Sequence, residues 1–202
     1  MNGKFFDLKK EKQDRMINAA LKIFALHGYK HASTDDIVKE AGISKGLLFH
    51  YFGSKLGCYT FIYDYSVRYM CLELKSAVSS KETEPFEIIK QIEQAKLQAL
   101  KGYPYMQQFL TRCAKEDVSE ALLAIEEMRA TYNETFDGIV SRMDFTAFPE
   151  GVDGQKVIKM LDFTIKGLMS DRFWDASFHA EMLYKEIIDY IDMVKKLTYK
   201  ED

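Results

Sequence analysis

The sequence predicts an all-α protein of about nine helices. Apolar residues recur three or four positions apart in one segment after another, which is the period of an amphipathic helix. Only three prolines occur in 202 residues, and no run of alternating apolar and polar residues marks a strand. With 47% hydrophobic residues, the chain can bury a substantial core.

Residues 33–52 predict two short helices joined by a tight turn. Ser33 is a candidate N-cap, and Asp36 follows three residues later, as in a capping box. Gly42 is where the first of these helices would end, because glycine adopts the left-handed conformation without a Cβ penalty. Ser44 then opens the second helix. Two helices joined by a glycine-containing turn form the helix-turn-helix layout, whose second helix enters the major groove of DNA.

The second helix of this pair has an inner and an outer side. Leu48, Phe49 and Phe52 can anchor the inner side in a small core. The residues at or near the outer side are Lys45, Gly46, Leu47, His50 and Tyr51.

A longer pattern surrounds these helices. It consists of Gly28-Tyr29, Ser33-Thr34, Ile37-Val38, Ala41-Gly42-Ile43, the run from Ser44 to Phe52, and Lys55. In order and spacing this pattern resembles the N-terminal domain of the TetR family of bacterial transcriptional regulators. The resemblance covers about residues 9–60, and it implies a DNA-binding domain over residues 1–54. It also implies a helical effector-binding and dimerisation domain over residues 55–202.

The resemblance assigns DNA contacts to particular positions. The two helix starts at Ser33-Thr34 and at Lys55 would hold the phosphate backbone, although Ser33 can equally be a pure cap. Lys45, Gly46, Leu47 and His50 would face the groove floor, with an ordinary surface histidine as the alternative for His50. Tyr51 would give its hydroxyl to a phosphate. The full predicted set is Ser33, Thr34, Ser44, Lys45, Gly46, Leu47, His50, Tyr51 and Lys55.

Phe49 departs from the family pattern, which usually has tyrosine at this position. Phenylalanine has no hydroxyl to donate, so Phe49 is interpreted as a packing residue.

Charge is distributed unevenly along the chain. Residues 1–55 hold ten Lys/Arg and six Asp/Glu, a balance of +4, whereas the remainder holds 18 and 25, a balance of −7. A basic N-terminal part on an acidic remainder fits a protein that offers only its N-terminus to phosphate. Ordinary surface variation is the alternative.

The remaining helices follow from apolar spacing. They are expected at residues 9–27, 55–78, 85–101, 105–114 and 119–143, followed by two more after the loop-like stretch 145–154. Residues 1–8 are expected to form a loose arm. Lys4 in this arm, and Lys9, Lys10 and Lys12 just after it, either touch the DNA backbone or lie in solvent.

By the same resemblance, the second domain encloses a small-molecule effector among its helices. Aromatic residues there suit an apolar site, and the candidates are Tyr65, Tyr69, Phe109, Tyr132 and Phe136. Plain core packing is the alternative for each, and the favoured one. A cationic drug, a fatty acyl group and a planar aromatic molecule all remain open as the effector.

The last two helices carry regular apolar seams, which suit a helical bundle or a subunit interface. The predicted dimer-interface residues are Ile158, Leu161, Ile165, Leu168, Leu183, Ile187, Tyr190 and Val194. The resemblance implies a four-helix homodimer interface here, and packing within one chain explains the seams equally well. Trp174, between the seams, is expected in the core or the interface.

Other classes of protein are disfavoured. The sequence lacks the short motifs of zinc proteases, serine hydrolases and nucleotide-binding enzymes, so no enzyme, cofactor or metal is expected. Cys58, Cys71 and Cys113 are interpreted as structural thiols. With no signal-peptide pattern and no long apolar run, a cytoplasmic location without membrane insertion is expected.

The sequence therefore predicts a ligand-responsive regulator, most simply a dimeric repressor on a palindromic operator. The alternative is an effector-independent, chromosome-organising DNA-binding protein of the same fold.

Overall fold

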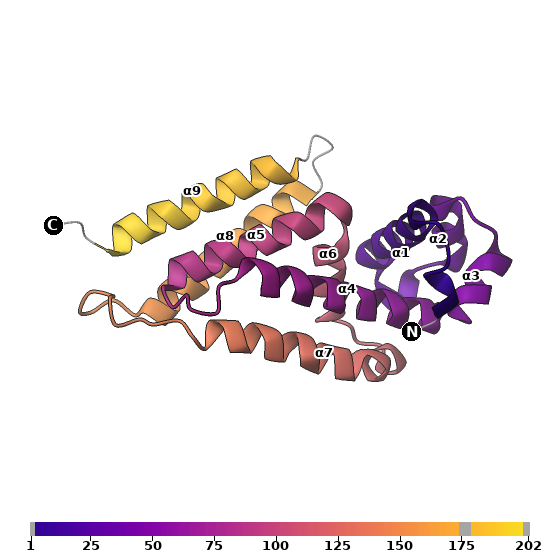
Figure 1. The fold of residues 1–202 in the computed structure, drawn as a ribbon, viewed down its shortest axis with the longest axis horizontal. Coiled ribbons are helices and arrows are strands. Elements are labelled where there is room, and N and C mark those ends of the chain that lie inside the picture. Colours follow the sequence, from indigo (N-terminus) through magenta and orange to yellow (C-terminus); the bar gives the residue numbers. More distant parts are fainter. Residues whose placement is uncertain (1–2, 174–178, 200–202) are drawn as a thin grey trace. The chain divides into compact units, whose positions relative to one another are not determined.

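In the computed structural model, residues 3–173 and 179–199 are described, and Trp174 lies outside these ranges (Figure 1). The described part holds one 3-10 turn, nine α-helices and no strand, which confirms the all-α prediction. The elements are η1 (Gly3–Phe5), α1 (Lys10–His31), α2 (Thr34–Ala41), α3 (Lys45–Phe52), α4 (Lys55–Ala77), α5 (Pro85–Gly102), α6 (Met106–Cys113), α7 (Ser119–Val140), α8 (Gly154–Phe173) and α9 (Ala180–Thr198). None of these helices is both long and apolar enough to cross a bilayer.

The helices form two compact units. The first unit holds the chain up to Cys71 together with Gly102–Glu134, and the second unit holds Leu72–Lys101 and the chain from Thr135 onward. The predicted boundary between a DNA-binding domain (residues 1–54) and an effector domain (residues 55–202) does not coincide with these units. That functional division stays a prediction.

The caps of α2 and α3 follow the sequence signals. Ser33 Oγ accepts a hydrogen bond from Asp35 N at 3.1 Å, one residue earlier than in a standard capping box. Gly42 ends α2 with φ 62°, in the left-handed region that favours glycine. Ser44 Oγ accepts from Leu47 N at 3.2 Å and so fixes the start of α3. The helix-turn-helix is therefore built from local signals.

The end of α1 is fixed by Gly28 and Tyr29. Gly28 has φ 68°, and a Cβ there would lie 2.8 Å from Arg112 Nε of α6. Tyr29 turns into the core, and its hydroxyl donates to Glu120 Oε1 at 2.6 Å. Burial and this hydrogen bond raise the pKa of Tyr29 to about 12. The tyrosine therefore stays protonated and keeps donating at neutral pH.

The N-terminal segment corrects one expectation. Residues 3–5 form η1, and Phe5 is fully buried, so the prediction of a loose arm was wrong. The Gln13 side chain also donates to the carbonyl oxygens of Phe6 and Leu8, at 3.1 and 2.7 Å. One large apolar side chain and one amide brace are enough to order so short a segment.

Aromatic side chains of α4 fill much of the core of the first unit. Tyr59 packs edge-on against Phe24 and Phe109, and its hydroxyl donates to Cys113 Sγ at 3.1 Å. Burial raises the pKa of the Cys58 and Cys113 thiols to about 12. A buried thiol with so high a pKa stays protonated, which fits the structural role predicted for these cysteines.

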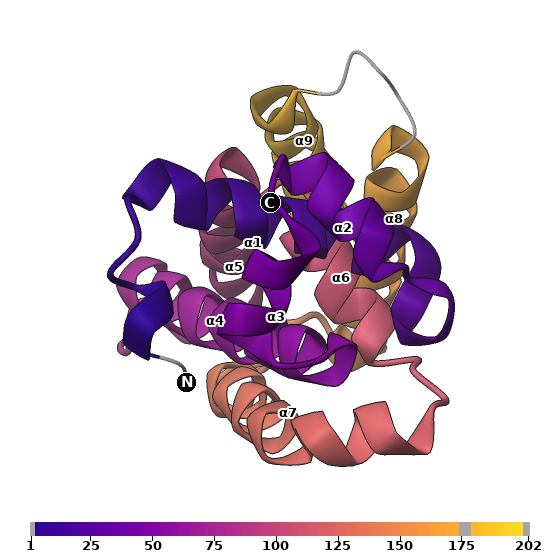
Figure 2. The same cartoon turned by 90° about the vertical axis from the view of Figure 1, so that its right-hand side faces the viewer.

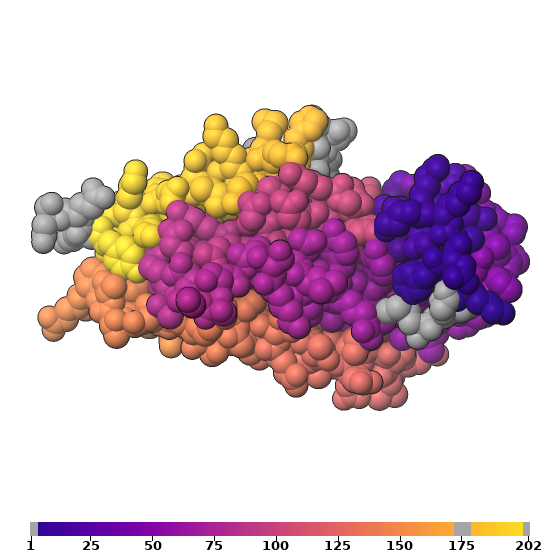
Figure 3. Space-filling model, in the orientation of Figure 1, coloured from indigo at the N-terminus to yellow at the C-terminus, as the bar shows by residue number. Residues whose placement is uncertain are grey.

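The core of the second unit lies between helices α4, α5 and α7 to α9. Ion pairs hold α9 along α5, and the two helices lie alongside each other in Figures 1 and 3. Lys195 Nζ lies 3.0 Å from Glu84 Oε2 and 2.8 Å from Glu87 Oε1. The hydrogen bond from Lys195 lowers the pKa of Glu87 although partial burial opposes the shift.

Candidate nucleic-acid interface

The outer side of α3 presents the predicted DNA-reading residues to solvent. Ser44, Lys45, Gly46 and His50 are exposed, and Leu47 and Tyr51 are half-buried. On the inner side, Leu48 and Phe52 are buried as predicted. Phe49 is half-buried rather than buried, because it lies at the edge between the two sides.

Lys45 is the cation at the start of α3. Its Nζ lies 2.8 Å from Asp35 Oδ1 in the first turn of α2, and both side chains are more than half exposed. A pair this exposed is typically worth less than about 1 kcal/mol. A DNA phosphate or a guanine can therefore replace Asp35 as the partner of Lys45.

Lys55 at the start of α4 is already engaged within the protein. Its Nζ donates to the Lys30 carbonyl oxygen at 3.2 Å and lies 4.8 Å from the centre of the Tyr29 ring. An ammonium group has three donors, so a phosphate contact remains compatible with this arrangement. Its role in DNA binding stays a prediction.

Ser33 and Thr34 are half-buried at the N-terminus of α2. The amide groups of a helix N-terminus and its positive dipole end favour a phosphate. Ser33 Oγ is used as the cap, so any phosphate contact there would come from its remaining hydroxyl donor or from backbone N–H groups.

Tyr51 lies at the C-terminal end of the exposed face. Its ring meets His50 edge-on, with ring centres 5.0 Å apart. The helix-turn-helix therefore brings Lys45, His50 and Tyr51 onto one short helix, with Ser33 and Thr34 on α2. Such a helix can place several side chains at base edges while its ends hold phosphates.

Gly57 controls how α3 joins α4, and its role was not predicted from the sequence. A Cβ at Gly57 would lie 2.0 Å from the backbone oxygen of Phe52, so only glycine fits. Its amide also donates to Ser54 Oγ at 3.0 Å. The signal in the sequence is a glycine inside the first turn of a helix, where neither a turn nor a cap requires one.

The comparison with known families now decides the identity of this domain. Residues 16–60 match the bacterial regulatory proteins of the tetR family. The chain carries the N-terminal domain of the TetR family. The matched segment runs from α1 through α3 into α4, so the TetR-family domain includes every predicted DNA-binding residue.

Two curated relatives are similar over this domain only. YuxN of Bacillus subtilis, described as an uncharacterized HTH-type transcriptional regulator, is 50% identical over 46 residues, which are 23% of this chain and 16% of YuxN. TtgW of Pseudomonas putida, described in the same words, is 38% identical over 47 residues, 23% of this chain and 35% of TtgW. The chain thus matches well under half the length of either relative.

Solved structures extend the likeness to the whole chain. A TetR family regulator from Chloroflexus aurantiacus has a TM-score of 0.61 at 19% identity and covers 98% of both chains. PfmR from Thermus thermophilus has a TM-score of 0.62 at 21% identity, covering 90% of this chain and 94% of PfmR. FadR from Bacillus subtilis, solved in complex with stearoyl-CoA, has a TM-score of 0.54 at 17% identity. The match covers 88% of this chain and 96% of FadR. At these identities the likeness shows that the chain has the TetR-family fold.

The five predicted effector residues divide between the two units. Phe109 is fully buried against Phe24 and Tyr59, as a core residue is. Tyr65 and Tyr69 are half-buried and both meet the ring of Tyr103 edge-on.

Tyr132 also lies in the first unit, which therefore holds four of the five predicted effector residues. Burial raises the pKa of the Tyr132 hydroxyl. Phe136 belongs to the second unit and packs against its core. Binding of an effector by these five residues stays a prediction.

The predicted interface residues also separate into two groups. Leu161, Ile165, Leu183 and Ile187 are buried in the core of the second unit. Ile158, Leu168 and Val194 are partly buried against the same core, and Tyr190 is half-buried. Packing within one chain, the alternative interpretation of the seams, therefore accounts for most of this stripe. Contacts with a second copy stay a prediction.

Proposed function

We propose that this protein is a transcriptional regulator that binds a palindromic DNA operator as a homodimer and acts as a repressor released by a small-molecule effector. The observation that carries the proposal is the exposed face of α3 inside a TetR-family domain. One helix of eight residues reads only a few base pairs, so usable affinity needs two such helices on two half-sites. The DNA-binding residues keep the roles expected from the sequence.

Removing Lys45 or the Tyr51 hydroxyl is expected to weaken operator binding without unfolding the protein. Each change removes a charge-assisted hydrogen bond to DNA, and the loss should be about tenfold. Gel-shift titration of Lys45→Ala and Tyr51→Phe measures it, on an operator selected by the wild-type chain. Lys81→Ala, which removes an exposed lysine between α4 and α5, is the matched control and should bind like wild type. Unchanged affinity in both variants would overturn the proposed docking.

The dimer surface that we propose is the outer face of α8 and α9. Exposed apolar side chains gather there: Met160 at 55%, Phe163 at 62%, Met182 at 69%, Met193 at 48% and Leu197 at 75% exposure. The two helices pack against each other, so their outer faces can form one surface. Exposed apolar surface shared by neighbouring helices is typical of a protein interface. A second copy of the chain is the partner that a palindromic operator requires.

We also propose that the effector is an acyl amphiphile with an anionic group. Support comes from FadR, a structural neighbour solved with stearoyl-CoA. A second support is Arg142, just after α7 in the second unit. Its Nε and Nη2 atoms are buried and have no hydrogen-bond partner in the described part of the chain. Arg142 as a whole is half-buried, and a carboxylate or phosphate would satisfy these two buried donors.

Stearoyl-CoA is expected to release the operator in a gel-shift titration, whereas stearyl alcohol is not. Arg142→Met should raise the stearoyl-CoA concentration needed for release about tenfold, because one charge-assisted contact is lost. Its thermal stability should be unchanged or higher, since two buried donors without a hydrogen-bond partner in the described part of the chain are removed. Arg68→Met, which removes an exposed arginine on α4, is the control. If neither compound affects DNA binding, the acyl effector is wrong and the effector-independent alternative gains support.

A further inference from the structure

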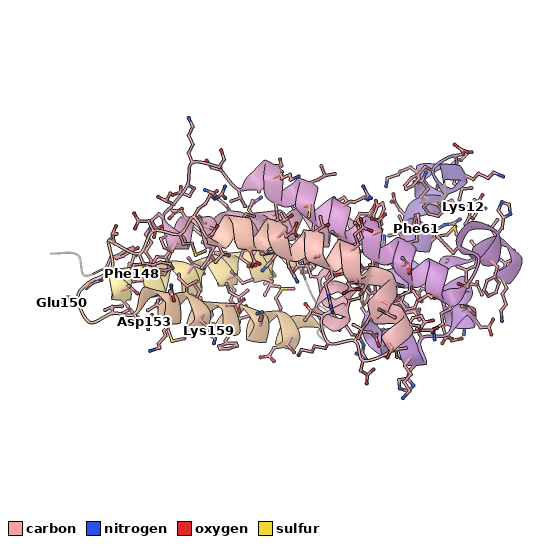
Figure 4. All side chains as sticks on the ribbon, turned by 90° about the horizontal axis from the view of Figure 1, so that it is seen from below. Lys12, Phe61, Phe148, Glu150, Asp153 and Lys159 are labelled. Atoms are coloured by element: carbon pink, nitrogen blue, oxygen red, sulfur yellow. The ribbon has the colours of Figure 1, made fainter. Side chains whose placement is uncertain are left out.

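The N-terminal arm, residues Gly3–Leu8, is anchored to the DNA-reading helix by one aromatic side chain. Phe5 is fully buried. Its ring centre lies 4.9 Å from that of Phe61, 5.4 Å from that of Phe52 and 5.7 Å from that of Tyr51. Phe52 and Tyr51 are the last two residues of α3, and Phe61 lies on α4, where it is labelled in Figure 4. The arm is therefore packed onto the C-terminal end of α3.

The backbone of the arm is fixed as well as its side chain. Gln13 of α1 is buried, and its amide donates to the carbonyl oxygens of Phe6 and Leu8. Leu8 N also donates to Phe5 O at 3.3 Å. With the phenyl ring held at one end and the backbone braced at the other, the arm has a defined path. Figure 2 shows its short turn beside α3 and α4.

The arm borders the proposed DNA contacts through Tyr51. The Tyr51 ring meets both His50 and Phe5 edge-on. Lys4 immediately precedes Phe5 and is exposed. The arm therefore carries a cation one residue from the side chain that touches Tyr51, the proposed phosphate ligand. A cation in this position would add to the phosphate contacts that dominate protein–DNA affinity.

We propose that the arm is part of the DNA-contacting surface, in which Lys4 contacts the phosphate backbone and Phe5 is the positioning residue that holds it there. This inference rests on the proposed DNA-binding function and adds an element that the helix-turn-helix does not contain. Phe5 acts through Lys4 and does not itself touch DNA. The anchor explains why a phenylalanine lies fully buried in a segment that precedes the first helix.

The test measures how operator affinity depends on salt concentration. Each phosphate contact contributes about 0.9 to the slope of log affinity against log salt, so losing one lysine per subunit of a dimer should lower the slope by about 2. Lys4→Ala should show this loss, with weaker binding at low salt. Phe5→Ala should lower the slope by the same amount although every lysine is retained. Phe5→Leu, which keeps a large apolar side chain, should keep most of the wild-type slope. Lys81→Ala, an exposed lysine in the second unit, is the control.

A double-mutant cycle separates positioning from general stability. If Phe5 positions Lys4, the Lys4→Ala change should have no further effect in the Phe5→Ala background. Additive losses would show that Phe5 only stabilises the fold, and an unchanged slope in Lys4→Ala would show that the arm does not touch DNA. Either result overturns the inference, and the second can be obtained even if Phe5→Ala fails to fold. Failure of the wild-type chain to bind any duplex would instead overturn the proposed function.

Discussion

Replacing Gly57 by alanine is expected to disrupt the DNA-binding domain and abolish operator binding. The added Cβ would lie 2.0 Å from Phe52 O, an approach that real Cβ atoms essentially never make. Neither atom can rotate away. The Cβ would be fixed to the backbone of α4, and the oxygen belongs to the backbone of the last residue of α3. The junction must therefore shift by about 1 Å or more, at a cost of about 1–3 kcal/mol in unfolding free energy. Because this junction sets the direction of α3, operator affinity should fall at least about tenfold even where the domain still folds.

Two measurements separate the stability effect from the DNA effect. Chemical denaturation gives the change in unfolding free energy, and fluorescence anisotropy with the operator gives the change in affinity. Gly138→Ala is the matched control, since a Cβ at this helical glycine of α7 meets nothing within 4 Å. It should be neutral or stabilising by up to about 1 kcal/mol. Wild-type stability and affinity in Gly57→Ala would show that the close approach does not exist in solution.

The second large effect is expected from Phe163→Glu on α8. Phe163 is 62% exposed, and Lys159 Nζ lies 5.9 Å from the centre of its ring (Lys159 is labelled in Figure 4). A carboxylate within the proposed apolar dimer surface must lose its hydration when two copies meet, even where Lys159 can pair with it, so the variant should be monomeric. Losing the second DNA-binding domain removes the advantage of bivalent binding, and operator affinity should fall about 100-fold or more.

Sedimentation analysis gives the oligomeric state of this variant, and gel shift gives its affinity. Leu123→Glu is the matched control, because Leu123 on α7 is 72% exposed and lies outside the proposed surface. It should remain dimeric and bind like wild type. A dimeric Phe163→Glu would exclude the outer face of α8 as the interface, and a monomeric Leu123→Glu would move the interface to α7.

The parts of the fold that local chemistry determines were predictable. Ser33, Gly42 and Ser44 stop and start helices through contacts with residues at most a few positions away, so their signals are complete within the sequence. The same holds for Gly28, whose positive φ ends the regular part of α1. The two helices of the helix-turn-helix were consequently predictable from local sequence, although Phe49, expected on the inner side, is half-buried.

Features that depend on distant contacts were not predictable in the same way. A stripe of apolar residues on α8 or α9 shows that one face is buried, but not whether its own chain or a second copy covers it. Leu161 and Leu183 turned out to face their own core, while Met160 and Met182 next to them are exposed. The anchored arm and the close approach at Gly57 likewise depend on where α4 passes the end of α3, which no local pattern encodes.

The pairing of Lys45 with Asp35 is a further example. Ten positions separate them in the sequence, and the turn at Gly42 brings them within 2.8 Å. In the proposed function, DNA would have to compete for Lys45 with an acid already present in the domain. Affinity should therefore depend on Asp35 as well as on Lys45, although only the lysine was expected from the sequence.

Selection of bound sequences from a random duplex library, followed by footprinting, tests the central claim most directly. Two α3 helices related by a two-fold axis should select an inverted repeat whose half-sites lie about one helical turn apart or a multiple of it. The footprint should cover both half-sites with two chains per duplex. Enrichment of no sequence, or of a single asymmetric site bound by one chain, would contradict the account.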